Sequence, residues 1–242
     1  MAKHDLDALG SVGIRDPLAG VGTGDLTGQF LLADLGVLKD FRQDLIQQGE
    51  TRINFYVTAA SVSLVGIGVV SQGVAFDVAF LVSTFVVFGL IAMGLITFVR
   101  MVERSIGIVL YARRINRIRR YFQDCDKDIV QYMSFPAYDD VPRFRRMGLL
   151  TRGSDSFGLP ELVAVLNSIV ISSGAAVALA VVAGVSIVWP AILGASVFVV
   201  GLVLHSGYHN RRMAAAERSA EVRFPSPKGK TATRDLSDVD GI

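Results

Sequence analysis

Two histidines, His205 and His209, are spaced as a pair of metal ligands would be on a helix. Residues four positions apart lie on one helix face, and imidazole nitrogen is a common ligand of Zn²⁺. Two side chains do not complete a zinc site, however, and no neighbouring set of Cys, Asp or Glu supplies the missing ligands. The pair is therefore interpreted as polar anchors beside Tyr208, and no metal or other cofactor is expected.

The other chemical motifs in the sequence are also incomplete. The stretch Gly20-Val-Gly-Thr-Gly24 has the glycines of a phosphate-binding loop, but no strand precedes it and the Lys and Ser/Thr of a Walker motif are missing. No serine lies in a GXSXG pattern, and no HEXXH pattern is present. The single cysteine, Cys125, excludes an internal disulfide and fits a reducing compartment. The sequence thus predicts a protein that is not an enzyme.

Small residues recur every four positions within one long apolar stretch, and polar residues lie beside them. The row consists of Ser168, Ser172, Ala176, Ala180 and Gly184, with Asn167 next to its first member. Small side chains let helices approach closely, which in lipid is a main source of helix association. The row therefore predicts a tightly packed helix. The alternative is the wall of a water-filled pore, lined by Asn167, Ser168 and Ser172.

Four arginines form a basic face further back in the chain, namely Arg113, Arg114, Arg117 and Arg120. On a helix they project within about 120° of one another. Such a face near a bilayer either is solvated and sets the orientation of the protein or binds anionic lipid. Asp124 and Asp128 project onto the same face, so nucleic acid is an unlikely partner. The solvated, orientation-setting face is the favoured interpretation.

The elements that carry these residues are predicted from three stretches without Asp, Glu, Lys or Arg: Ile53–Phe76, Val78–Val99 and Leu162–Asn210. About 20 apolar residues in a helix cross the roughly 30 Å hydrocarbon layer once. The third stretch is long enough for two crossings, with Trp189-Pro190 marking the reversal. The expected spans are Ile53–Gln72, Val78–Val99, Leu162–Ser186 and Ala191–Gly207. A buried hairpin of a soluble protein explains one such run but not four, particularly at 51% apolar residues and a mean hydropathy of +0.47.

The positive charges predict which way the spans face. Of the 24 Lys and Arg residues, five precede the first span, twelve lie between the second and third, and seven follow the fourth. The turns at Gln72–Asp77 and near Trp189 contain none. Because Lys and Arg resist translocation, both termini and the central loop are expected in the cytoplasm of a cell that carries the protein in its inner or plasma membrane. No cleavable signal peptide is evident, so the first span is expected to be retained as an anchor.

Two helices are predicted outside the bilayer. Residues 26–50 form an amphipathic helix through Leu31, Leu35, Leu38, Phe41 and Leu45, with a break near Gly49. The second span is expected to continue as a stalk helix to about Ser134, with an apolar seam at Ile108, Tyr111, Ile115, Ile118 and Phe122. We expect this seam to pair antiparallel with the first helix in the same subunit. The alternative is a parallel coiled coil between subunits.

The predicted organisation is an all-α integral membrane protein with four spanning helices in two hairpins and with cytoplasmic amphipathic helices. Its segments are a flexible arm (1–25), the amphipathic helix (26–50), hairpin one (51–99), the stalk and connecting loop (100–160), hairpin two (161–209) and a C-terminal tail (210–242), which is expected to be disordered from Arg223. The expected function is that of an assembly or scaffold subunit that forms a homo-oligomer in the lipid bilayer. The alternative function is a pore or channel gated from the cytoplasmic side.

Overall fold

The computed structural model describes residues 23–135, 137–145, 147 and 158–227, and every regular element in this part of the chain is a helix. The elements are α1 (Thr23–Gly73), α2 (Phe76–Cys125), the short 3₁₀ helix η1 (Lys127–Tyr132), α3 (Leu159–Ala183) and α4 (Val188–Ser219). The predicted all-α class is confirmed. The arm before Thr23 and the tail beyond residue 227, including most of the glycine stretch at 20–24, lie outside the described residues.

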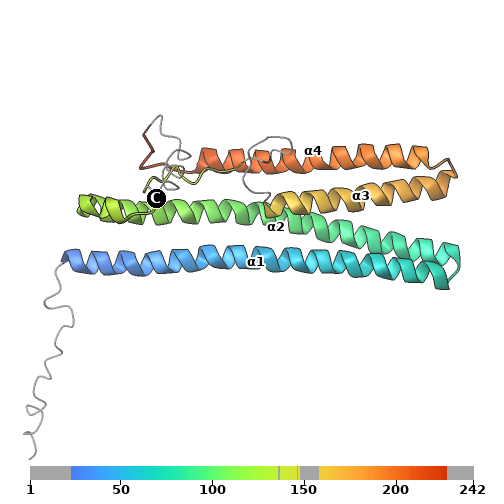
Figure 1. Cartoon of the computed structure of the whole chain (residues 1–242), viewed down its shortest axis with the longest axis horizontal. Helices are drawn as coiled ribbons and strands as arrows, with labels where there is room; N and C mark the ends of the chain where they lie inside the picture. Colours follow the sequence, from blue (N-terminus) through green and yellow to red (C-terminus); the bar gives the residue numbers. More distant parts are fainter. Residues whose placement is uncertain (1–22, 136, 146, 148–157, 228–242) are drawn as a thin grey trace, which may run out of the picture.

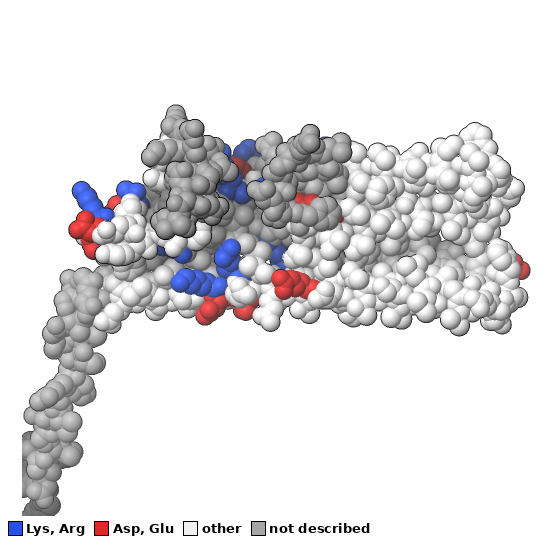
Figure 2. Space-filling model, in the orientation of Figure 1, with Lys and Arg blue, Asp and Glu red and all other residues white. Residues whose placement is uncertain are grey.

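The four long helices form two antiparallel hairpins, α1–α2 and α3–α4, which join where α2 packs against α3. All four are long and apolar enough to cross a membrane. Figure 2 shows that charged side chains gather at one end of the molecule, whereas the end with both hairpin turns is almost uncharged. Asp77, in the first turn of α2, is the acidic residue near that end. The protein is thus a four-helix membrane protein whose charged side chains gather at one end.

Helices α1 and α2 are much longer than a bilayer is thick. They have 51 and 50 residues, so each is about 75 Å long, compared with roughly 30 Å of hydrocarbon. The predicted break near Gly49 is wrong, because α1 continues through it. Gly49 is buried, and a Cβ there would lie 3.5 Å from Leu159 and 3.7 Å from Met101. These are ordinary van der Waals distances, so three helices pack together at Gly49 and the glycine does not end α1.

The parts of α1 and α2 outside the predicted spans, residues 23–52 and 100–125, are called the stalk below. Its core consists of Leu38, Ile115 and Ile118, with Leu31, Leu35, Tyr111 and Phe122 packed around them. The rings of Phe41 and Tyr111 also stack, with centroids 5.9 Å apart. The seam of α2 therefore lies against α1 of the same chain. Ile108, nearer the membrane, is half-buried.

Helix α2 ends nine residues earlier than the expected Ser134. Asp126 adopts an extended conformation, and its carboxylate accepts a hydrogen bond from the backbone N–H of Asp128 at 2.9 Å. This local bond competes with continuation of the helix, as Asp side chains commonly do. The chain then continues as η1.

Helix α3 ends three residues before the expected Ser186, whereas Trp189-Pro190 lies at the start of α4, as expected for the reversal. Helix α3 ends at Ala183, and Gly184 follows in the left-handed conformation with φ of 56°. Glycine adopts this conformation without a steric penalty and commonly ends helices in this way. Gly184 is therefore a helix terminator and not the last member of a packed row. Helix α4 begins at Val188, so Trp189 and Pro190 lie in its first turn.

The main core lies where the hairpins enter the charged region. Ile53, Phe98, Met101, Val102, Val163, Ala164 and Met213 form it together with Phe144 and Met147 of the central loop. The loop is held there by Asn210, whose side chain accepts a hydrogen bond from the backbone N–H of Met147 at 2.7 Å and donates one to its carbonyl at 3.2 Å. The connection between the hairpins thus folds back onto the helices.

Candidate functional site

The basic face of α2 meets the central loop and the end of α4. Arg113 is 2% exposed, and its guanidinium lies 3.1 Å from the Glu217 carboxylate of α4. It also donates to the carbonyl of Pro142 at 3.3 Å and lies 4.7 Å from the centroid of the Phe144 ring. A cation–π contact and an ion pair thus hold this charge away from solvent.

Arg117, one turn along α2, binds the segment that follows α4. Its Nε lies 2.8 Å from the carboxylate of Asp139, and its Nη2 donates to the carbonyl of Glu221. Asp139 is fully buried and also accepts hydrogen bonds from the backbone N–H groups of Arg223, at 2.9 Å, and Phe224, at 2.8 Å. The backbone N–H of Asp139 donates in return to the carbonyl of Phe224 at 3.1 Å. The loop and the C-terminal segment are therefore joined through one carboxylate.

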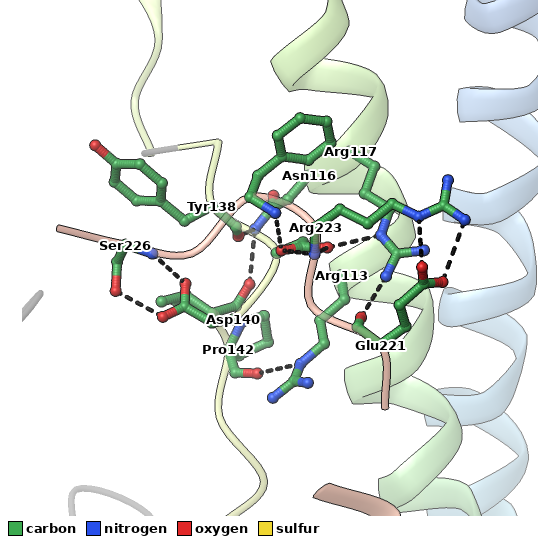
Figure 3. Close-up of polar contacts among 12 residues, drawn as sticks. Arg113, Asn116, Arg117, Tyr138, Asp140, Pro142, Glu221, Arg223 and Ser226 are labelled. Carbon is green, nitrogen blue, oxygen red and sulfur yellow. Dashed lines mark hydrogen bonds and ion pairs between the residues drawn. The ribbon is translucent and has the colours of Figure 1, made fainter. Parts of the chain in front are cut away.

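Two further contacts extend this arrangement (Figure 3). The side-chain amide of Asn116 donates to the carbonyls of Tyr138 and Val141, at 2.9 and 2.8 Å. Asp140 accepts from the backbone N–H and the hydroxyl of Ser226, at 3.0 and 2.6 Å. We call the whole set the polar latch. Its members are Arg113, Asn116, Arg117, Asp139, Asp140, Glu217, Glu221, Arg223, Phe224 and Ser226.

The electrostatics of the latch depend on the ionised form of Asp139. Burial alone raises the pKa of this carboxyl, but the two backbone N–H bonds and the guanidinium of Arg117 outweigh it and hold the pKa below its ordinary value. The ion pair of Arg223 with Glu221 similarly lowers the pKa of the Glu221 carboxyl. Asp139 and Glu221 are therefore ionised at neutral pH, and their ion pairs with arginine hold the latch together.

These contacts correct the interpretation of the four arginines as a solvated face. Arg113 and Arg117 are engaged by loop and C-terminal residues, whereas Arg114 is exposed and lies 5.7 Å from the centroid of the Tyr111 ring. Arg120 pairs with Asp124 at 3.0 Å. The latch also fixes Arg223, Phe224 and Ser226, so the expected disorder from Arg223 onward is wrong for the described residues up to 227.

A second polar group lies among the spanning helices. The hydroxyl of Tyr56 on α1 donates to Oδ1 of Asn167 on α3 at 2.7 Å, and the Asn167 amide nitrogen lies 3.5 Å from Nε2 of His205 on α4. Nδ1 of His205 lies 2.7 Å from the carbonyl of Gly201. A carbonyl only accepts, so Nδ1 carries the proton and Nε2 is free to accept from Asn167. Tyr56 thus donates to Asn167, and Asn167 donates to His205, so the hydrogen bonds join three helices.

Glycines at the crossings make room for this group. A Cβ at Gly94 of α2 would lie 2.0 Å from Oδ1 of Asn167, and one at Gly201 would lie 2.9 Å from Oγ of Ser168. A Cβ at Gly194 would lie 3.3 Å from that of Ala176 and 3.5 Å from the carbonyl of Ser172. The small side of α3 therefore packs against glycines of α4, as small residues commonly do in membranes.

Of the three residues considered for a pore wall, Asn167 and Ser168 lie buried between helices, whereas Ser172 is half-buried and its hydroxyl donates to the carbonyl of Ile169 at 3.0 Å. Asn167 is 1% exposed and Ser168 is fully buried, with its hydroxyl bonded to the carbonyl of Ala164 at 2.8 Å. Ala180 is half-buried, and Gly184 is exposed beyond the end of α3. Among the described residues, the first members of the row thus contribute to helix packing, and the pore wall stays an untested alternative.

The two histidines point to different surroundings. His205 joins the buried group and contacts the edge of the Phe98 ring, with centroids 4.6 Å apart. His209 is 3% exposed, and its Nδ1 has no hydrogen-bond partner among the described residues. Within the described ranges no set of three His, Cys, Asp or Glu side chains is placed to hold a metal ion. The absence of a cofactor stays a prediction.

No protein-family model, curated protein or solved structure matches this chain.

The chemistry available at both polar groups is hydrogen bonding and ion pairing. The latch unites α2, the loop and the end of α4, and the buried group unites α1, α3 and α4. Sequence reasoning found Asn167 and the arginines but missed Asp139, Glu217 and Tyr56. The one usable signal was the adjacent pair Asp139 and Asp140 inside a connection otherwise rich in arginine.

Proposed function

We propose that this chain is a non-enzymatic, multi-pass membrane protein that assembles with copies of itself through its stalk. The stalk and both termini face the cytoplasm. The positive-inside rule supports this orientation, because all 24 Lys and Arg residues lie outside the two hairpin turns.

One observation carries the proposal: the stalk keeps a partly exposed apolar stripe beside its closed core. Phe30, Val37 and Phe41 of α1 are 71%, 50% and 50% exposed. Their spacing of seven and four residues places them on one helix face. These residues lie on the charged side of the first span, where apolar side chains gain by leaving water. The stripe therefore favours contact with another protein surface.

A second copy is the partner that the arrangement favours. Helix α1 lies at the edge of the helix row and packs mainly on α2, which leaves its outer side open. A bilayer holds all copies in the same orientation and at the same height. The stripes of two copies therefore lie at the same depth and run in the same direction, so the copies can associate side by side without reorienting. Asp44, three residues after Phe41, ends the stripe towards the membrane.

The test compares two single substitutions on the exposed surface of α1. Val37→Asp places a charge in the stripe, whereas Gln43→Asp places the same charge on an exposed position of another face. Masses measured in mild detergent should show an oligomer for the unmodified chain and for Gln43→Asp, and a monomer for Val37→Asp. A monomeric unmodified chain, or an oligomer that persists in Val37→Asp, contradicts the proposal.

A further inference from the structure

Three arginines cluster where α1 and α2 leave the membrane. Arg52 immediately precedes the first span, and Arg100 and Arg104 follow the second. Arg52 and Arg100 lie close enough to Arg104 for their charges to repel it. Such a cluster of like charges is unfavourable in the free protein and is relieved by a bound anion.

Among the described residues, these arginines have few partners. Nη2 of Arg104 donates to Oε1 of Gln48 at 3.1 Å, while its Nη1 is buried and has no hydrogen-bond partner among the described residues. Arg100 pairs with Glu103 at 3.2 Å, and both side chains are well exposed. Within the described ranges, Glu103 is paired with Arg100 only, so the cluster keeps a positive charge, and Arg104 keeps an unused buried donor.

An apolar groove between α1 and α2 opens beside Arg52. Its volume is about 610 Å³, and it is lined by Thr51, Arg52, Phe55, Met93, Ile96 and Thr97. This volume lies within the roughly 300–1,000 Å³ typical of small-molecule sites. Phe55 and Ile96 are 67% and 60% exposed and belong to the predicted spans, so the groove faces hydrocarbon while its mouth lies at the headgroup level.

We propose that this place binds an anionic phospholipid, with the phosphate against Arg52 and Arg104 and one acyl chain along the groove. Guanidinium groups suit phosphate because they offer several donors in a planar fork. The adjoining apolar surface selects a lipid over a soluble anion. The arginines further along α2 are less suited to this role, because Arg113 and Arg117 are already bound within the latch.

Native mass spectrometry of the intact protein in mild detergent tests the proposal, with phosphatidylglycerol and phosphatidylcholine as probes. Phosphatidylglycerol should remain bound and phosphatidylcholine should not. The double substitution Arg52→Gln with Arg104→Gln should weaken phosphatidylglycerol binding by about 30-fold, because each arginine near a membrane surface contributes about fivefold. An excess of inorganic phosphate should leave the lipid bound, since phosphate lacks the acyl chain.

The matched control is Arg211→Gln with Arg212→Gln, which removes two exposed charges just beyond the fourth predicted span. This variant should keep its affinity for phosphatidylglycerol. Ile96→Trp, which fills the groove and leaves all three arginines in place, should lose the lipid. Equal retention of both lipids, displacement by inorganic phosphate, or equal losses in the two double variants would overturn the assignment. Circular dichroism checks that each variant keeps its helices.

Discussion

Single carboxylates and amides decide how the charged half of this molecule is held together. Asp139 satisfies two backbone N–H groups and one guanidinium, while Asn116 satisfies two carbonyls. Both residues are buried, so a lost partner leaves a polar group without water, which costs more than an exposed hydrogen bond. Replacing a single oxygen or nitrogen atom in one of these side chains should therefore weaken the latch.

Acid should open the latch at Asp139. Its pKa is lowered in the folded protein relative to the unfolded value of about 3.9. The stabilisation is therefore fully present above the unfolded pKa and is lost as pH falls through the lower, folded pKa. Hydrogen exchange at the backbone N–H groups of Arg223 and Phe224 should show protection at pH 6 that fades only below about pH 4.

Asp139→Asn should reduce this protection already at neutral pH, because the amide carries no charge for Arg117. A loss of about 1–3 kcal/mol is expected for the segment. Asp40→Asn, at an exposed position of α1, is the matched control and should leave the protection unchanged. Equal protection in Asp139→Asn and the unmodified chain would mean that the carboxylate does not hold the segment.

In this fold, helices pack against one another at glycine positions. Gly94 lets α2 approach Asn167 of α3, and Gly201 brings α4 against Ser168. Close approach maximises van der Waals contact, which is the main attraction between helices where lipid replaces water. The bonds of Asn167 to Tyr56 and His205 then fix the register of helices whose apolar surfaces alone specify little.

Gly94→Ala should loosen the membrane bundle. The added Cβ would lie 2.0 Å from Oδ1 of Asn167 and 2.7 Å from the hydroxyl of Tyr56, so the buried group must move. Overpacking of this kind costs about 1–3 kcal/mol. Denaturation in mixed detergent micelles, followed by circular dichroism, measures the change.

Gly89→Ala is the control for that substitution, because a Cβ there meets nothing within 4 Å. It lies on the same helix and changes helix propensity by the same amount, so its stability should match or exceed that of the unmodified chain. Equal destabilisation of the two variants would argue that propensity, and not the crossing at Asn167, governs stability.

At the scale of the whole molecule, charge is separated along the long axis. Figure 2 shows a nearly uncharged half, which fits hydrocarbon, and a charged half. In the charged half, loop, stalk and α4 pack together. The main core lies between them and is shared by both hairpins. The two halves are therefore one folded unit rather than a bundle carrying independent appendages.

The proposed orientation predicts which residues a membrane-impermeant maleimide reaches. Cys125 is exposed at the end of α2 and should be labelled in inside-out vesicles but not in intact cells. Trp189→Cys, in a background with Cys125→Ser, should be labelled only from the outside. Labelling of Cys125 in intact cells would reverse the topology.

The sequence by itself determined the all-α class and the number and approximate positions of the spans, because the length of an uncharged run and the placement of charge are properties read along the chain. The seam of α2 and the small-residue row of α3 were also visible, since both follow helical periodicity. Helix ends were less certain, because Asp126 and Gly184 act through local bonds and backbone conformation.

Only the tertiary structure decided what the buried polar residues touch. Arg113 and Glu217 are 104 positions apart, and Tyr56 and Asn167 are 111 apart, so no local pattern joins them. Their pairing depends on how the second hairpin packs on the first. A row of arginines has the same sequence pattern whether its side chains contact water, lipid or a carboxylate from a distant part of the chain. The free energy of burying each charge differs between these cases, but it is set only when the chain has folded.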